Sequence, residues 1–412
     1  MSNKVSTHIT SPPWWLWIIL VHILFITTTG LKVFHKVPKW LKPGDSALNL
    51  LAEHNYAVWW SGFCLMLAGI LFYYLASQVH NVGKDRFMWL VLAAVTLGLS
   101  ADEVASVHER VSQFGGWWAL LPFAILGTLA FGYAIIRMIL DQARRVSALL
   151  ICTSLIIFFA VAGLEHLEHT ADFSFYVAKS RLIVEEGAEL IAGFLLILAA
   201  ILQVRKSTGV AISQMTTIVA PGSLIWIKQV LFFGLILHLL VCIFWVPVIW
   251  VPAGAPGHER GNPAYWYPMF VFVLAAFHCA CQARTTPILR SQVFWVVGVL
   301  MFLGLSTGQM INHGYFISVY TEILPKELHI AFYARASWTV LPPLLFILFL
   351  KPGLGSVNYL FLTLFLIYLL HPGRAYFEAY YILSGFAAYL LIFLLLNTTR
   401  SGDRNELYKQ KL

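Results

Sequence analysis

Long apolar runs separated by short polar stretches make up most of this chain. Each run is close to the roughly 20 residues that an α-helix needs to cross the hydrocarbon core of a bilayer. About twelve such runs occur, and they begin near Trp14, Tyr56, Phe87, Trp117, Ser147, Arg181, Leu224, Ala264, Ser291, His329, Ser356 and Ala375. The pattern predicts an all-α, polytopic transmembrane helical bundle.

The longest polar linker, from Lys206 to Gly222, divides these runs into two groups of six. We therefore expect two six-helix bundles, formed by residues 1–206 and 207–412. The two parts share no sequence repeat, which gives no support to an inverted-repeat transporter.

Composition supports a membrane protein, because 59% of the residues are hydrophobic and only 11% are charged. A soluble domain carries about 25% charged residues. The positive-inside rule places both termini in the cytoplasm, with most lysines and arginines on that side and most acids on the other. The net charge of +8 is thus a sign of membrane topology and does not indicate nucleic-acid binding. We expect an integral membrane protein in contact with the lipid bilayer.

Aromatic, histidine and cysteine residues in the apolar runs have structural interpretations. Tryptophans at the ends of the predicted spans, such as Trp59, Trp60 and Trp266, are typical of an interfacial aromatic belt. His238 and His278 lie in mid-span and are expected to be buried and hydrogen-bonded. All five cysteines fall in apolar runs, which argues against a disulfide framework.

Acidic residues gather in three stretches near span ends. They are Asp102-Glu103 with His108-Glu109, then Glu165-His166-Leu167-Glu168-His169 with Asp172, then Glu185-Glu186 with Glu189. The first two follow spans and the third opens the next span, so all three fall at the same, exoplasmic face of the membrane. Ionisable groups at a hydrocarbon boundary are costly unless they are paired, protonated or metal-bound.

Helical spacing turns several of these groups toward one point. At about 100° per residue, each of the three helices presents two or more carboxylates on one face. Oxygen and imidazole ligands of this kind suit a divalent metal such as Fe, Mn or Zn. The expected metal ligands are Asp102, His108, Glu109, Glu165, Glu168, His169, Glu185 and Glu189. The alternative is structural: Glu185 and Glu186 would stabilise the first helical turn, and Arg181 would neutralise a neighbouring acid.

The second half contributes another polar set on the same side. His313, Arg335, His371 and Arg374 lie at span ends or in outer turns. Arginine and histidine together suit a phosphate or carboxylate group. These four residues are therefore candidates for binding an anionic lipid or lipid-linked substrate.

As a set, three motifs in roughly the first 200 residues resemble a group of uncharacterised bacterial multi-pass membrane proteins. They are Glu53-x-Asn55 with Trp60-Ser61, Asp102-Glu103-x4-His108-Glu109, and Glu185-Glu186-x2-Glu189. The resemblance implies a bacterial cytoplasmic (inner) membrane protein with a common site, but no particular reaction. It adds Glu53 and Asn55 to the possible further members of the site, which also include Glu103, His166, Asp172 and Glu186.

Three functional hypotheses follow. The first is a metal-dependent membrane enzyme in which Glu165, His169 and Glu189 are catalytic and the metal activates water or dioxygen toward a lipid substrate. The second is a proton- or cation-coupled secondary transporter. The third is a membrane subunit of a larger complex.

Overall fold

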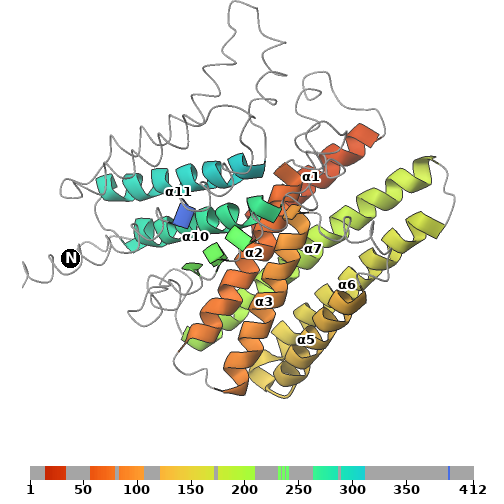
Figure 1. The fold of residues 1–412 in the computed structure, drawn as a ribbon, viewed down its shortest axis with the longest axis horizontal. Coiled ribbons are helices and arrows are strands. Elements are labelled where there is room, and N and C mark those ends of the chain that lie inside the picture. Colours follow the sequence, from red (N-terminus) through yellow and green to blue (C-terminus); the bar gives the residue numbers. More distant parts are fainter. Residues whose placement is uncertain are drawn as a thin grey trace, which may run out of the picture.

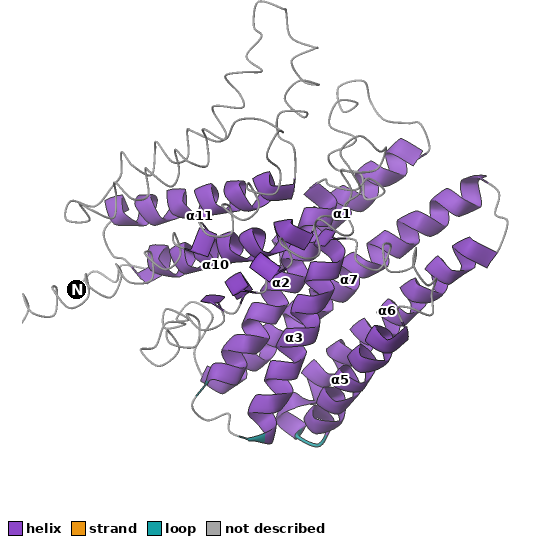
Figure 2. Ribbon diagram, viewed as in Figure 1, coloured by secondary structure: helices purple, strands orange, loops and turns teal. Residues whose placement is uncertain are grey.

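The computed structural model describes seven longer stretches of the chain and some short pieces. These are residues 14–33, 56–78, 83–105, 121–170, 175–208, 263–285 and 289–310, with 231–232, 234–236, 238–240 and 388–389. Within them every regular element is helical (Figure 2). The predicted all-α class is therefore confirmed for the described part of the chain.

The helices follow the predicted apolar runs. They are α1 (Trp14–Val33), α2 (Tyr56–Ser77), α3 (Lys84–Ala105), α5 (Leu121–Ile139), α6 (Arg145–Thr170), α7 (Phe175–Thr208), α10 (Pro263–Thr285) and α11 (Leu289–Met310), with a 3-10 turn, η3 (Gln142–Arg144), before α6. Several begin before the predicted span. For example, α3 starts at Lys84 instead of Phe87, because its first turn is held by ion pairs beyond the apolar run.

Five helices of the described part are long and apolar enough to cross a membrane. The segments are Val58–Ser77, Lys84–Val104, Leu121–Ile139, Gln142–Leu164 and Ser180–Val204. Two shorter apolar helical segments, Ile18–Thr29 and Trp266–Ala280, accompany them. The chain is therefore an integral, multi-pass membrane protein. The spans predicted to begin at His329, Ser356 and Ala375 lie outside the described residues, apart from 388–389, so the total of twelve stays a prediction.

Five of the helices form a closed circuit of contacts (Figure 1). The helix α2 lies beside α3 and α7, α6 lies beside α7 and α5, and α5 lies beside α3. Outside the circuit, α1 packs on α7, while α10 packs on α3 and α2 and is itself covered by α11. Serines tie α6 to α7, since Ser154 donates a hydrogen bond to the Ala192 carbonyl (3.0 Å) and Ser147 donates to that of Ala199 (3.1 Å).

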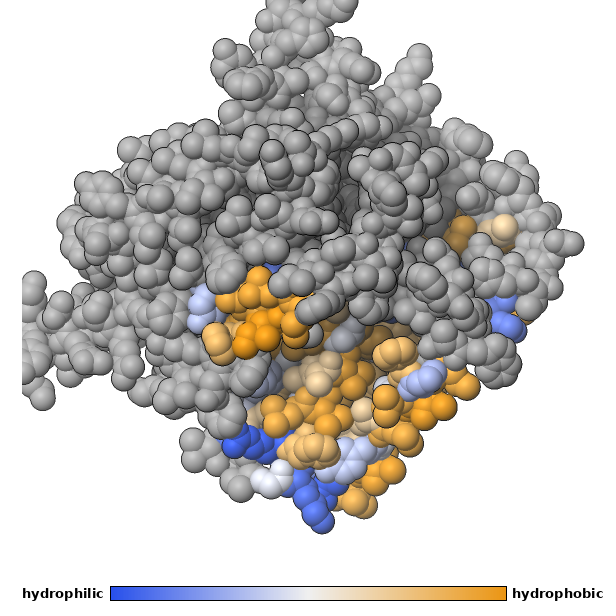
Figure 3. All heavy atoms as spheres, in the orientation of Figure 1, coloured by the Kyte–Doolittle hydropathy of each residue, from blue (hydrophilic) through white to orange (hydrophobic). Residues whose placement is uncertain are grey.

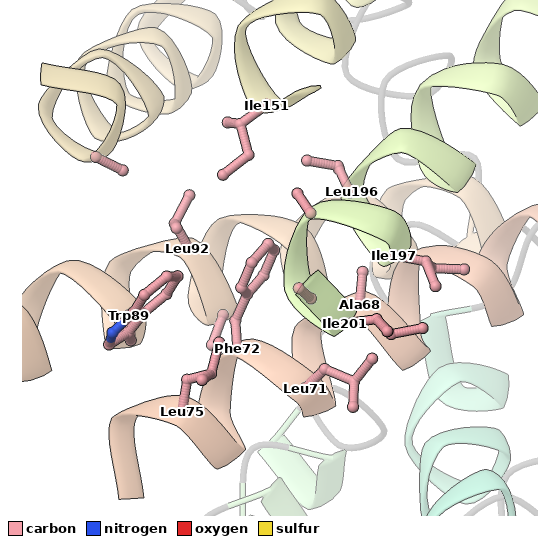
Figure 4. Close-up of a cluster of buried hydrophobic side chains, with 14 of the residues drawn as sticks. Ala68, Leu71, Phe72, Leu75, Trp89, Leu92, Ile151, Leu196, Ile197 and Ile201 are labelled. Atoms are coloured by element: carbon pink, nitrogen blue, oxygen red, sulfur yellow. The ribbon is translucent and has the colours of Figure 1, made fainter. Parts of the chain in front are cut away.

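One half of this circuit is filled with apolar side chains (Figure 4). Phe72 from α2, Trp89 and Leu92 from α3, Ile151 from α6 and Leu196 from α7 meet there and are almost fully buried. This core lies near the C-terminal end of α2 and the N-terminal end of α3. The opposite half of the circuit contains the ends of α3, α6 and α7 that carry the acidic stretches.

Described helices of the second predicted domain, α10 and α11, pack against the first bundle. A second core joins Trp59 and Met66 of α2 and Val104 of α3 to Phe272 of α10 and Phe302 of α11. The described helices of the second half therefore rest directly on the first bundle.

Candidate functional site at the acidic end

The acidic residues of α3 and α7 lie at one end of the bundle, which we call the acidic end and define by Asp102, Glu103, Glu185, Glu186 and Glu189. Helix α3 ends at Ala105 and α7 begins at Phe175, so the two antiparallel segments bring their acids to the same level. Glu189 is the meeting point, because its carboxyl group interacts electrostatically with the other four. The strongest of these interactions is with Glu103.

Glu189 occupies the position on α7 that faces the inside of the circuit. Arg181 and Ala192, on one side of it, contact α6 through hydrogen bonds to or from backbone carbonyls. Gly193, on the other side, approaches α2 at Cys64 and Leu65. Glu189 lies between these two faces and is partly buried.

Glu185 has a different environment from Glu189, one helical turn away. Its carboxylate forms an ion pair with the guanidinium of Arg181, and both residues are buried, with 9% and 8% of their surfaces exposed. Arg181 also donates a hydrogen bond of 3.0 Å to the Leu164 carbonyl at the end of α6. The pair thus connects α6 and α7, and Arg181 neutralises a neighbouring acid as the structural alternative predicted. The first-turn interpretation of Glu185 and Glu186 is wrong, because α7 begins at Phe175 and has no acid in its first turn.

The other predicted site residues divide into two groups. Glu165, Glu168 and His169 lie on the last turns of α6 but their side chains are not described, while His166 on the same turns is exposed. The remaining candidates lie outside the described residues: Glu53, Asn55, His108, Glu109, Asp172, His313, Arg335, His371 and Arg374. Among the side chains that the structure does describe, no three His, Cys, Asp or Glu residues are grouped closely enough to hold a metal ion.

A hydrogen-bonded serine supports the acid pair of α3, and the sequence analysis did not single it out. Ser100 lies just before Asp102 and donates a hydrogen bond of 2.8 Å to the Gly62 carbonyl of α2. It also accepts a bond of 3.1 Å from the indole nitrogen of Trp266 on α10. The signal in the sequence was a serine inside an apolar run, two residues before an acid. Through the bond from Trp266, the second half of the chain contacts the end of α3 that carries Asp102 and Glu103.

Two tryptophans assigned to an interfacial belt have another role. Trp59 is buried, and its indole nitrogen donates a 3.1 Å hydrogen bond to Ser306 on α11. Trp266 is partly buried and bonds to Ser100. Each indole N–H is therefore satisfied between helices, and Trp59 is buried in protein instead of facing lipid.

The mid-span histidines are buried, as expected, but Nε2 of His278 lacks the expected hydrogen bond within the described part of the chain. His238 stacks on Tyr267 with ring centroids 5.2 Å apart, and His278 meets Trp295 edge-on at 6.5 Å. His22 of α1 was not considered from the sequence. It is buried against Trp60 and Phe194, and its Nδ1 lies 2.7 Å from the Ile18 carbonyl. These three rings belong to helix interfaces.

Comparison with known proteins finds one family model that matches the first half of the chain. No curated protein and no solved structure matches the chain, so these two comparisons assign no activity. The region that a family model matches spans nearly all of the circuit of five helices and of α1, including the described residues of the acidic end. Residues 15–204 match the family described as Domain of unknown function (DUF8692).

Proposed function

We propose that the acidic end binds a divalent metal ion and that the protein is a metal-dependent membrane enzyme acting on a lipid or lipid-linked substrate. The observation that carries the proposal is the position of Glu189, a partly buried carboxyl group that interacts electrostatically with four other acids from two helices. Like charges gathered in a medium of low dielectric repel one another strongly unless a cation or protons compensate them.

The structure changes which residues we assign to the metal. Glu185 is paired with Arg181, so we assign it to holding α6 against α7. Glu103 is added to the candidate ligands, because it lies beside Asp102 at the end of α3 and interacts electrostatically with Glu189. The described carboxylates alone are not grouped closely enough to hold an ion. The proposed ligands are therefore Glu189 and one acid of α3, Asp102 or Glu103, completed by residues whose side chains are not described: His108, Glu109, Glu165, Glu168 and His169.

A metal held there would lower the pKa of a bound water molecule or polarise a substrate oxygen. The side chains proposed to take part in the chemistry are Glu165, His169 and Glu189. Arg335 and Arg374, with His313 and His371, would hold an anionic head group at the same membrane face. This last assignment rests on the sequence alone.

The packing of the circuit favours an enzyme over a transporter. A conduit through the five helices would have to pass the opposite half, which is filled by Phe72, Trp89, Leu92 and Ile151. The carboxylates, in contrast, lie at one end. This arrangement suits chemistry at the membrane surface better than passage of a cation along the circuit.

The test is elemental analysis of the detergent-purified protein after reconstitution with Fe, Mn or Zn. We expect one metal at close to stoichiometric amounts, and a loss of most of it in Glu189→Gln. Asp141→Asn is the matched control, since it removes a carboxylate at the other end of the bundle, where Asp141 pairs with Arg144. A folded wild-type protein that binds none of these metals would contradict the proposal and favour proton or cation coupling instead.

A further inference from the structure

The end of the bundle opposite the carboxylate site is built from basic residues, and we call it the basic end. It consists of Lys84, Arg86, Arg137, Arg144 and Arg145 with Asp85 and Asp141. Hydrophilic atoms gather there, at the lower tip in Figure 3, next to the apolar surface of the spans. The proposed metal site does not involve any of these residues.

Ion pairs hold three helices together at the basic end. Asp85 of α3 accepts from Arg137 of α5 and from Arg144 of η3, each at 2.9 Å. The Nε of Arg144 also lies 2.9 Å from Asp141, and its guanidinium lies 5.8 Å from the Trp89 ring. Both acids of this end are therefore used to fix Arg137 and Arg144 in place.

The remaining basic residues give this end an excess of positive charge. Lys84 and Arg145 are both exposed. Each is hydrogen-bonded to or near α5: the Tyr133 hydroxyl donates to the Lys84 carbonyl, and the Nε of Arg145 donates to the Ile139 carbonyl. Five basic residues face two acidic ones here. An anionic group approaching this surface is attracted to it.

An apolar surface begins directly beside these charges. Ile136 and Leu140 at the end of α5 are 63% and 75% exposed, and Val146 and Leu149 at the start of α6 are 54% and 62% exposed. Both helices belong to segments that are apolar and long enough to cross a membrane. Their outward faces therefore contact acyl chains, and the basic residues are then at the level of the lipid head groups.

We propose that the basic end binds an anionic phospholipid of the surrounding leaflet. Its phosphate lies between Lys84 and Arg145, and its acyl chains lie along Ile136, Leu140 and Leu149. The ion-paired Arg137 and Arg144 shape the surface and add to its positive potential. The occupant is a lipid because the charged and apolar parts of the surface adjoin each other on spanning helices.

The test compares lipids that differ only in their head group. Full-length protein in detergent is titrated with phosphatidylglycerol or phosphatidylcholine of the same chains, and bound lipid is measured by native mass spectrometry. The variant Lys84→Gln/Arg145→Gln keeps both Asp85 ion pairs. We expect it to weaken phosphatidylglycerol binding at least about tenfold, since each basic residue at a membrane surface contributes roughly fivefold, and to leave phosphatidylcholine binding unchanged.

Two controls make the result decisive. Lys179→Gln removes one positive charge from α7 near the acidic end, and it is expected to change phosphatidylglycerol binding less than twofold. Inorganic phosphate is expected not to displace the lipid at equal concentration, because it lacks acyl chains. Equal binding of the two lipids, unchanged binding in the double variant, an equal loss in Lys179→Gln, or displacement by phosphate would each overturn the proposal. Melting temperatures without lipid verify that the variants are folded.

Discussion

Glu185 and Glu189 lie one turn apart on α7, and the structure gives them different neighbours. Their spacing allowed the prediction that they share a face with Arg181, and the ion pair between Arg181 and Glu185 agrees with it. The sequence did not indicate which of the two carboxylates would take the arginine. That choice depends on how α6 lies against α7, where the Leu164 carbonyl holds the other side of the guanidinium.

The buried ion pair predicts a specific pattern in a double-mutant cycle. Arg181→Met removes the cation and leaves Glu185 charged in a buried position, which should lower the free energy of unfolding by about 3–5 kcal/mol. Adding Glu185→Leu removes the uncompensated charge, so the double variant should recover most of that loss. Thermal unfolding in detergent, followed by tryptophan fluorescence, measures each variant. Additive losses would show that the two residues are not coupled.

At Glu189, in contrast to Arg181, a single substitution is expected to increase the stability of the metal-free protein. Glu189→Gln keeps the shape of the side chain but removes repulsion from Glu103 and the other acids, so the metal-free protein should become more stable by roughly 1–2 kcal/mol. A group that destabilises the fold is typical of a site kept for function. The melting temperature of the chelator-treated protein is the measurement.

Asp141→Asn is the control for that change, because the same replacement occurs there beside Arg144 instead of beside other acids. Asn retains the N-cap that Asp141 provides to Ala143. It should be neutral or destabilising by up to about 1 kcal/mol, as for an exposed ion pair. If both variants shifted stability in the same direction, the carboxylates around Glu189 would not be repelling one another.

At the level of elements, the apolar runs predicted where the helices lie in the sequence, but not which helices pack against each other. Each described helix matches an expected span, since both depend on a local length of apolar chain. Trp266 is an example of a contact between helices that the apolar runs do not predict. Its place near a span end suggested an interfacial aromatic belt, but gave no sign of its hydrogen bond to Ser100 on α3. Such a contact joins residues far apart in sequence, and helical periodicity carries no information about it.

The close packing of α2 against α3 predicts that adding a side chain at Gly62 lowers stability. A Cβ added at Gly62 would lie 2.7 Å from Cγ2 of Val104, in the same place where Ser100 bonds to the Gly62 carbonyl. Gly62→Ala should therefore separate the helices and cost about 1–3 kcal/mol.

Gly98 offers the matched comparison on α3, because a Cβ there meets no atom within 4 Å. Gly98→Ala should be neutral or stabilising by up to about 1 kcal/mol, as expected for alanine in an open helical position. Urea or thermal unfolding of both variants in the same detergent provides the measurement. Equal destabilisation by the two substitutions would contradict the tight α2–α3 contact.

For the whole molecule, the division of charge is the feature that sequence and structure share most closely. The basic residues between α2 and α6 meet at one end around Asp85, while the acids of α3 and α7 meet at the other around Glu189. Counting spans was enough to predict that the acids of α3 and α7 lie at the same end of the bundle. The contact between the two halves of the chain was not predictable in this way, because no polar motif marks the packing of α10 on α2 and α3.

The charge division predicts opposite labelling of the two ends in membranes. In a variant whose five native cysteines are replaced, Gln142→Cys reports the basic end and His166→Cys the acidic end; both positions are exposed. The positive-inside rule predicts that a membrane-impermeant maleimide labels position 166 in right-side-out vesicles and position 142 in inverted ones. Labelling of both positions from one side would contradict the assignment of η3 and the end of α6 to opposite faces. Opposite labelling with reversed sides would keep the bundle and would place the carboxylate site in the cytoplasm, where its substrate would have to come from the inner leaflet.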